Sequence, residues 1–286
     1  MNSMPESAIL FLSCQDKKGI VAEITHFISM YEGNILNCDQ HYDESGMFFM
    51  RVEWDLTDFA LPAEKISSAF EPIAIKFEMG WKLEFSNEIH SMAILVSKYD
   101  HCLYELLLRN RAGELKANIK MIISNHPDTK PIAEYFGIPF YHFPVTKETK
   151  KEAENQQIAL LKKEKIDLIV LARYMQILSS NFVESFPRKI INIHHSFLPA
   201  FVGAKPYHQA FSRGVKLIGA TSHYVTEDLD QGPIIAQDVT RVNHRNSIAD
   251  LVEKGRNLEK TVLSKGVQLH LQNKVLVFGN KTIIFE

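Results

Sequence analysis

The first third of the chain alternates short apolar runs with two stretches of helical periodicity. Between residues 8 and 86 the order is strand, helix, strand, strand, helix, strand, which predicts a ferredoxin-like βαββαβ unit. Residues 44–46 are expected to form a hairpin turn within it. A four-stranded sheet with both helices on one face leaves its other face and its edges uncovered. We therefore expect this unit to pair with another copy of the chain.

The pattern changes after the short polar segment FSNEIHS, which we interpret as a linker. From Met92 onward, near-continuous apolar strands alternate with helical stretches, which indicates a mostly parallel, doubly wound α/β sheet covered on both faces. A long helix from about Ser247 to Asn273 and an apolar hairpin follow. The pattern thus predicts two domains, residues 1–86 and residues 87–286. Ligands of open parallel sheets bind beyond the carboxyl ends of the strands.

Composition narrows the class of protein. The 286 residues are 45% hydrophobic and 23% charged, with a net charge of −2, so the chain has no global bias toward nucleic acid or anionic membranes. The lysines of residues 147–165 are interspersed with glutamates and predict a solvated helix face. Three scattered cysteines without a CxxC pair predict buried thiols in a reducing compartment. No apolar run reaches about 18 residues and no secretory signal is visible, so we expect a soluble cytoplasmic protein.

Candidate chemistry is concentrated at the end of one predicted strand, KIINIHHS. Asn192 and His194 are two residues apart, so their side chains leave an extended strand on the same face, while His195 points to the other face. We therefore expect only two of these three residues to share a site. An amide beside an imidazole supplies a hydrogen-bond donor and a group that exchanges a proton near neutral pH. The alternatives are a metal site, for which no HxxxH pattern or carboxylate triad is present, and a structural histidine pair.

The segment DLDQGPII places Asp230 before Gly232 and Pro233, in a tight turn that leads into an apolar strand. An ordinary turn aspartate is the simplest interpretation. A carboxylate near an imidazole would instead orient the ring and favour its protonated form. The sequence alone does not show whether Asp230 reaches His194.

Two motifs together carry a family resemblance. NIHHSFLPAFVGAKPYHQA and DLDQGPI resemble the folate-dependent formyltransferase and deformylase superfamily, over roughly residues 91–286. The catalytic set of that superfamily is an asparagine, a histidine two residues later and an aspartate about three dozen residues further on. The resemblance implies that Asn192, His194 and Asp230 are catalytic, that 10-formyltetrahydrofolate is the substrate, and that no metal or other cofactor takes part.

The resemblance also implies a folate pocket. The segment LARYMQIL would surround the pteridine, and the loop from Val225 to Asp230 would close the other side. Lys205 would either orient the substrate or serve the structure of its own loop. The substrate-binding residues expected on this basis are Leu171, Met175, Gln176, Leu178, Lys205, Val225 and Glu227.

The acceptor of the formyl group separates hydrolases from transferases in this superfamily. A glycinamide ribonucleotide formyltransferase would have a glycine-rich turn for the substrate phosphate after the first strand of the domain. Here residues 94–107 contain no glycine, and Asp100 places a carboxylate there. A methionyl-tRNA formyltransferase would carry a further basic domain, and we see no basic block. Water is then the expected acceptor, and transfer to an amine such as glycinamide ribonucleotide is the alternative.

On this interpretation the chain is a hydrolase that converts 10-formyltetrahydrofolate to formate and tetrahydrofolate. Such a reaction would supply formate for purine synthesis and balance the one-carbon pools.

The first domain has a resemblance of its own. CQDKKGIVAEITHFISMYEGNI is similar to the start of an ACT domain, a module that binds an amino acid between paired copies. The resemblance implies that Asp16, Gly19, Ile20 and Asn34 contact a regulatory amino acid, glycine or methionine, and that the protein is a homo-oligomer. Two alternatives stay open: the domain only joins subunits, or the whole chain is a folate sensor without turnover. Neither nucleic acid nor a membrane is an expected partner.

Overall fold

The structure is a computed structural model, and it describes residues 6–200 and 206–286. The chain forms two compact units. The first consists of Met1–Glu88 with two short stretches from the end of the chain, Gln272–Leu276 and Ile283–Glu286. The second consists of Ile89–Leu271 and Val277–Thr282. The sequence did not predict that the last residues of the chain would belong to the first unit.

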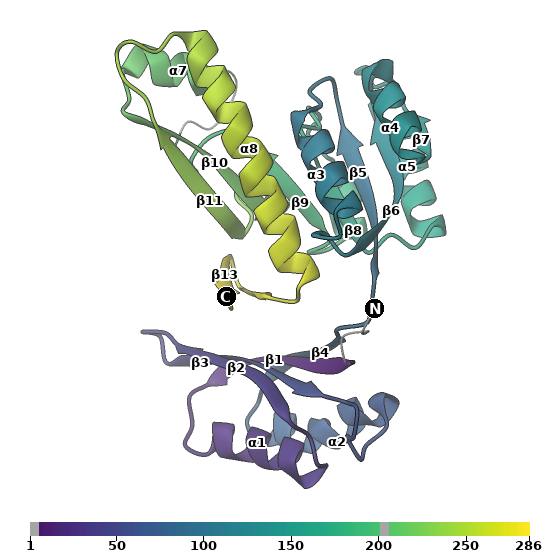
Figure 1. Cartoon of the computed structure of the whole chain (residues 1–286), viewed down its shortest axis with the longest axis vertical. Coiled ribbons are helices and arrows are strands. Elements are labelled where there is room, and N and C mark those ends of the chain that lie inside the picture. The colour runs from purple at the N-terminus through teal and green to yellow at the C-terminus, as the bar shows by residue number, and fades with distance from the viewer. Residues whose placement is uncertain (1–5, 201–205) are drawn as a thin grey trace. The chain divides into compact units, whose positions relative to one another are not determined.

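The first unit is a ferredoxin-like βαββαβ fold, as predicted (Figure 1). Its elements are β1 (Ser7–Gln15), α1 (Ile20–Met30), β2 (Ile35–Tyr42), β3 (Met47–Asp55), α2 (Ala63–Lys76) and β4 (Gly80–Phe85). The strands are antiparallel, in the order β2-β3-β1-β4. Alternate residues of β1, from Ala8 to Cys14, form a core with residues of α1 and α2 and with the fully buried Trp54 of β3.

The turn between β2 and β3 lies where the sequence predicted it. Gly46 has a left-handed φ of 84°. The Asp43 carboxylate accepts hydrogen bonds from the backbone N–H groups of Ser45 and Met47. These local contacts fix the register of the two strands.

The face of this sheet that points away from α1 and α2 is partly covered by the end of the chain. The ring of Phe285 lies 6.1 Å from the ring of Phe11. Arg51 Nε donates a hydrogen bond of 2.7 Å to the backbone oxygen of Asn273, and the same guanidinium, only 4% exposed, forms an ion pair with Glu53. The chain therefore supplies some of the cover that we expected from a second copy.

The second unit is a mostly parallel α/β sheet with helices on both faces, as predicted (Figure 1). Its strands are β5 (His90–Val96), β6 (Ala117–Ser124), β7 (Phe140–His142), β8 (Leu168–Leu171), β9 (Ile190–His194), β10 (Leu217–Tyr224) and β11 (Ile234–Arg241). Its helices are α3 (His101–Arg111), the 3₁₀ turn η1 (Pro127–Thr129), α4 (Lys130–Phe136), α5 (Lys150–Lys163), α6 (Ser180–Ser185), α7 (Pro206–Arg213) and α8 (Ile248–Leu271). A terminal hairpin consists of β12 (Val275–Phe278) and β13 (Lys281–Ile284).

The order of the strands in the second unit is β11-β10-β9-β8-β5-β6-β7. Strands β5 to β9 run parallel, whereas β10 runs antiparallel to both β9 and β11. The order reverses at β5, which has β8 on one side and β6 on the other. The carboxyl ends of β5 and β8 therefore mark the expected ligand site.

Helices cover both faces of this sheet. Residues 92–96 of β5 are wholly buried. Ala93 and Leu95 share a core with Leu161 of α5 and Phe182 of α6. The intervening residues point to the other face, where α3 and α8 contact each other. Within the described parts of the chain, none of the helices has the length and apolarity needed to cross a membrane.

Candidate active site

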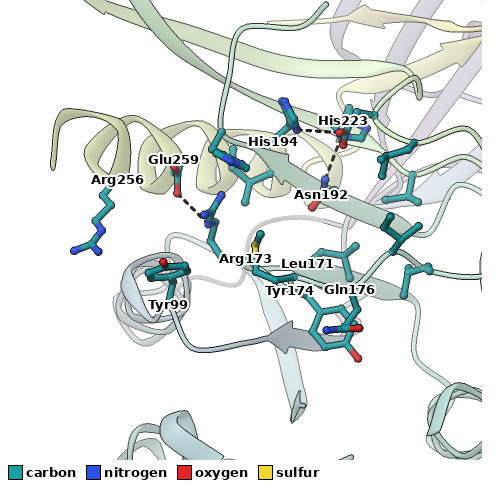
Figure 2. A pocket seen from close by; sticks show the side chains of 18 of the residues that line it. Tyr99, Leu171, Arg173, Tyr174, Gln176, Asn192, His194, His223, Arg256 and Glu259 are labelled. Atoms are coloured by element: carbon teal, nitrogen blue, oxygen red, sulfur yellow. Dashed lines mark hydrogen bonds and ion pairs between the residues drawn. The ribbon is translucent and has the colours of Figure 1, made fainter. Parts of the chain in front are cut away.

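The carboxyl ends of the strands open into a cavity of about 640 Å³ (Figure 2). Residues that follow β5, β8 and β9 line it, together with residues at the end of β10 and side chains from α7 and α8. The cavity therefore lies where the reversal of strand order predicts a ligand site. All of its lining residues belong to the second unit.

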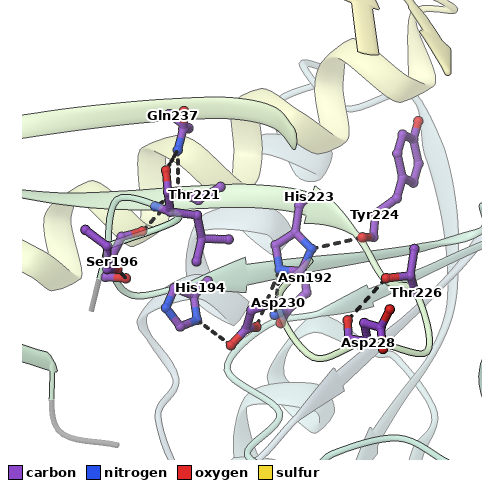
Figure 3. A network of polar contacts seen from close by, with 12 residues as sticks. Asn192, His194, Ser196, Thr221, His223, Tyr224, Thr226, Asp228, Asp230 and Gln237 are labelled. Carbon is purple, nitrogen blue, oxygen red and sulfur yellow. Dashed lines mark hydrogen bonds and ion pairs between the residues drawn. The ribbon is translucent and has the colours of Figure 1, made fainter. Parts of the chain in front are cut away.

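The three predicted catalytic residues, Asn192, His194 and Asp230, meet in this cavity (Figure 3). His194 is the last residue of β9 and only 5% exposed. Its Nδ1 lies 3.1 Å from Asp230 Oδ2. Its Nε2 is buried and has no hydrogen-bond partner among the described residues. Because an unpaired buried polar atom costs roughly 1–3 kcal/mol of stability, Nε2 is where a bound ligand would complete the hydrogen bonding.

A fourth polar side chain, His223, belongs to the same cluster, although the sequence pattern did not single it out. The antiparallel pairing of β9 with β10 places it opposite Asn192, whose Nδ2 lies 3.3 Å from His223 Nε2. Because an amide nitrogen only donates, His223 Nε2 accepts, and its Nδ1 donates to the Tyr224 backbone oxygen at 2.9 Å. The available signal was a histidine inside an apolar strand just before the loop of Asp230.

The Asp230 carboxylate is held in its ionised form. Burial disfavours the charge, because the side chain is only 10% exposed. The contact with His194 outweighs burial and holds the pKa of Asp230 well below its ordinary value. An ionised carboxylate on Nδ1 of His194 fixes the ring so that Nε2 is the nitrogen left for a ligand.

Backbone geometry places Asp230 as firmly as its side-chain contacts do. Its φ of 57° is left-handed, a conformation that aspartate tolerates better than most residues. Two residues later, Gly232 passes so close to β10 that a Cβ there would lie 1.8 Å from the Tyr224 backbone oxygen. The Tyr224 N–H donates to the Pro233 oxygen at 2.9 Å. Only glycine fits at position 232, so the predicted tight turn depends on this close approach.

The segment that follows β9 is anchored by Thr221 of β10 (Figure 3). The Thr221 hydroxyl donates to the Ser196 backbone oxygen at 2.9 Å. It accepts hydrogen bonds from the Leu198 N–H at 3.1 Å and from Gln237 Nε2 at 2.9 Å. Thr221 is fully buried, so this network holds the chain in one position directly after His194.

Most of the predicted substrate-binding residues line the cavity: Leu171, Met175, Gln176, Leu178, Val225 and Glu227. Lys205 lies outside the described residues. Hydrogen bonds tie the turn after β8 to the end of β5. The Met175 N–H donates to Ser97 Oγ at 2.9 Å, and Ser97 Oγ donates to Asn125 Oδ1 at 2.7 Å. The turn is therefore rigid before any ligand binds.

His195 also lines the cavity, so the expectation that it points away from the site was wrong. Strand β9 ends at His194, and the alternation of an extended strand does not apply beyond that residue. Burial, with the nearby Arg173 adding to it, lowers the pKa of His195 to about 4. His195 is therefore neutral at physiological pH.

A second polar cluster forms one wall of the cavity (Figure 2). The Glu259 carboxylate is 1% exposed and accepts hydrogen bonds from Tyr207 Oη at 2.6 Å and His101 Nε2 at 2.7 Å. It forms an ion pair with Arg173, whose Nε lies 3.4 Å away. Burial favours the neutral acid, but these contacts outweigh it and lower the pKa of Glu259. Burial and Glu259 raise the pKa of Tyr207, so the phenol stays protonated and donates.

The same cluster contains a possible set of metal ligands. Ligand atoms of His101, Cys102 and Glu259 lie within 4.8 Å of one another. A metal ion would need the Cys102 thiolate, whereas burial raises the pKa of this thiol well above its usual value. Glu259 is already bonded to two donors and to Arg173. The chemistry of these residues does not fit a metal ion, and we assign none to them.

The predicted amino-acid ligands lie in the first unit and do not meet within one chain. Asp16 follows β1, Gly19 precedes α1 with a left-handed φ of 96°, and Ile20 begins that helix. Asn34 lies beyond the other end of α1. An 11-residue helix spans about 16 Å. A single amino acid would therefore need two copies of the chain to contact both groups.

The fold and the cavity define the class of this protein, the formyl transferases. Residues 90–267 match the family described as Formyl transferase. The glycinamide ribonucleotide transformylase 1 of Symbiobacterium toebii shares this fold with a TM-score of 0.66 and 26% identity, covering 72% of this chain and 98% of that one.

Two further relatives are more similar and cover nearly the whole chain. A formyltetrahydrofolate deformylase of Synechocystis sp. is 53% identical over 280 residues, which are 98% of each chain. A crystal structure of a formyltetrahydrofolate deformylase from Pseudomonas syringae pv. tomato has a TM-score of 0.96 at 45% identity and covers 100% of this chain and 96% of that one. The chain belongs to the formyltetrahydrofolate deformylase family.

Proposed function

We propose that this protein is a hydrolase that cleaves the amide C–N bond of 10-formyltetrahydrofolate and releases formate and tetrahydrofolate. The names of its relatives support the substrate and the reaction. The observation that carries the proposal is the pair of His194 and Asp230. One imidazole nitrogen is committed to a carboxylate, and the other is buried without a partner in a cavity of ligand size.

The pteridine ring binds against the turn after β8. Leu171, Leu178 and Val225 offer apolar surface to its faces, and Gln176 offers an amide to its polar edge. The loop that ends at Asp230 covers the opposite side of the ring. Lys205 is a candidate for orienting the substrate. This placement brings the formyl carbon next to Asn192 and His194.

The side chains of the site match the charge that develops during hydrolysis. Water attacks the formyl carbon, and the former carbonyl oxygen becomes negatively charged. Asn192 Nδ2 and His194 Nε2 are the donors for that oxygen. Asn192 Nδ2 has a contact of 3.3 Å with a ring nitrogen of His223, which is weaker than a hydrogen bond to a developing anion. Asn192 Nδ2 therefore donates a stronger hydrogen bond to the transition state than it donates to His223 in the free enzyme.

Proton transfer completes the reaction. Asp230 holds the attacking water and stabilises the protonated form of His194. A proton from the water replaces the one that moves to the folate nitrogen as the C–N bond breaks. The second proton of the water leaves to solvent as formic acid ionises to formate, and the side chains return to their starting state once formate and tetrahydrofolate leave. Every step uses only residues that line the cavity.

The test is an assay without any acceptor. Purified protein should release formate and tetrahydrofolate in equal amounts from 10-formyltetrahydrofolate, and added glycinamide ribonucleotide should not divert the formyl group. Formylated ribonucleotide in place of formate would support the transferase alternative. Tight folate binding without turnover would support a folate sensor.

We further propose that the first unit is an ACT domain through which the chain forms a homo-oligomer and binds glycine or methionine. The strand order β2-β3-β1-β4 and the left-handed Gly19 at the start of α1 support this role. Unpaired N–H groups at the start of a helix suit an amino-acid carboxylate. Asp16 and the Asn34 of a second copy would then contact the amino group and the side chain.

The regulatory role predicts a change in formate release when glycine or methionine is added. Asn34→Ala should weaken the response by raising the effector concentration that it requires. Gln40→Ala, at an exposed position of β2, is the matched control and should respond like the parent. If neither amino acid changed formate release by the parent, the regulatory role would be wrong and only the role in oligomerisation would remain. Sedimentation velocity measures the number of subunits.

The same proposal places the enzyme in the cytoplasm, where it would supply formate for purine synthesis and balance the one-carbon pools. The three thiols are free, which supports a reducing compartment. Cys14 and Cys102 are buried as predicted, but the same expectation was wrong for Cys38, because it lies on the mostly exposed strand β2.

A further inference from the structure

We infer that Arg173, held in place by Glu259, closes the side of the cavity from which an acceptor would approach, and that water receives the formyl group for this reason. The inference rests on the proposed function and names what determines its acceptor. With the folate ring against the turn after β8 and the formyl carbon beside His194, an acceptor must enter from the remaining side. Figure 2 shows Arg173 and Glu259 on that side, away from Gln176.

The backbone of Arg173 has a conformation that arginine adopts rarely. Its φ is 63°, which is left-handed and ordinary for glycine. The peptide group that follows Arg173 and the one that precedes Ala172 are both fixed. The Ala172 N–H donates to the Leu95 oxygen at 2.8 Å, and the Ser97 N–H donates to the Arg173 oxygen at 3.2 Å. Arg188 has a similar backbone outside the cavity, so the case for Arg173 depends on the contacts of its side chain as well.

The side chain of Arg173 is buried between two partners, although its Nε makes no hydrogen bond to the described residues. It is 9% exposed, its guanidinium lies 5.3 Å from the centroid of the Tyr99 ring, and its Nε pairs with Glu259. Glu259 is itself immobilised by the hydrogen bond from Tyr207. Tyr207 reaches Glu259 only because residue 255 is a glycine. A Cβ at Gly255 would lie 2.1 Å from Tyr207 Oη. The guanidinium therefore cannot swing aside without breaking the ion pair with Glu259 and leaving the Tyr99 ring.

The charges on this side also disfavour an amine acceptor. The Glu259 carboxylate already accepts two hydrogen bonds and forms an ion pair with Arg173, so it has little capacity left to accept from an ammonium group. The Arg256 guanidinium lies 5.6 Å from the centroid of the same Tyr99 ring and adds a second positive charge beside that ring. A protonated amine would be repelled there, whereas water is neutral and small.

The first arm of the test removes the guanidinium. Arg173→Gly suits the left-handed backbone, and the amine supplied is glycinamide, which is smaller than the side chain removed. The ratio of N-formylglycinamide to formate should rise by about tenfold or more over the parent. In this transfer the bond from the formyl carbon to the folate nitrogen breaks, a bond to the amine nitrogen forms, and the proton that the amine loses replaces the one given to the folate nitrogen.

Two further variants make the result specific. Arg188→Gly is the matched control, because Arg188 has a φ of 59° and is exposed outside the cavity. Its product ratio should equal that of the parent. Arg173→Asn keeps a polar side chain that tolerates the left-handed conformation and should raise the ratio as Arg173→Gly does. Circular dichroism and thermal unfolding confirm that each variant is folded.

A second arm uses the unaltered protein. Hydroxylamine, which is hardly larger than water, should compete for the formyl group, whereas glycinamide at the same concentration should not. Equal competition by the two amines would overturn the inference. So would an unchanged product ratio in folded Arg173→Gly and Arg173→Asn while the parent releases formate. A parent that releases no formate at all removes the proposed function, and the inference with it.

Discussion

Asp230→Asn should lower kcat/KM for formate release by about 10³-fold. Asparagine has the size of aspartate but no charge, so it neither stabilises a protonated His194 nor holds the attacking water as a carboxylate does. The affinity for tetrahydrofolate should change little, because the predicted ring contacts lie on the turn after β8. Steady-state kinetics and calorimetric titration with tetrahydrofolate measure the two effects separately.

Asp228→Asn is the matched control for this variant. Asp228 lies on the same loop, but it is exposed and does not line the cavity. Its rate should stay close to that of the parent. If Asp230→Asn and the parent released formate at the same rate, Asp230 would have no part in the mechanism.

His194→Ala should lower kcat by about 10³-fold as well, and combining it with Asp230→Asn should cost little more. The two side chains are 3.1 Å apart and serve one proton transfer, so removing the first already removes the use of the second. A double-mutant cycle on kcat measures this coupling directly.

Gln176→Ala provides the comparison for the cycle. Gln176 lines the predicted folate side of the cavity, so its effect should add to that of Asp230→Asn on a logarithmic scale. Losses that add in the same way for His194→Ala and Asp230→Asn would show that the two residues act independently, against the mechanism proposed for them.

Much of the fold could be predicted because its signals are local. The βαββαβ order follows from the periods of the apolar positions, and the parallel sheet follows from the continuous apolar strands. The packing of Phe285 and Asn273 on the first sheet could not be predicted. That packing joins the two ends of the chain, and no period along the sequence reports such a contact.

The site divides in a similar way. Asn192 and His194 could be predicted because side chains two residues apart on one strand point to the same face of the sheet. His223 was not found, because its place depends on the pairing of β9 with β10. The direction of His195 was wrong because it depends on the residue at which β9 ends. Each missed feature depends either on a contact between segments that are distant in sequence or on the exact residue at which a strand ends.

The wall of Arg173 and Glu259 shows the same limit. Its residues come from the turns after β5 and β8 and from α7 and α8, and no motif joins them. Arg173 lies inside the segment LARYMQIL, where the sequence indicated folate binding. Only its backbone conformation and its buried partner show that its side chain turns to another part of the cavity.

The most direct measurement is hydrolysis of 10-formyltetrahydrofolate in H₂¹⁸O, with the formate analysed by mass spectrometry and the tetrahydrofolate counted. If water is the acceptor in the cavity of His194 and Asp230, each formate should carry one ¹⁸O atom and appear with one tetrahydrofolate. Unlabelled formate, or a formyl group that leaves folate without becoming formate, would contradict that mechanism.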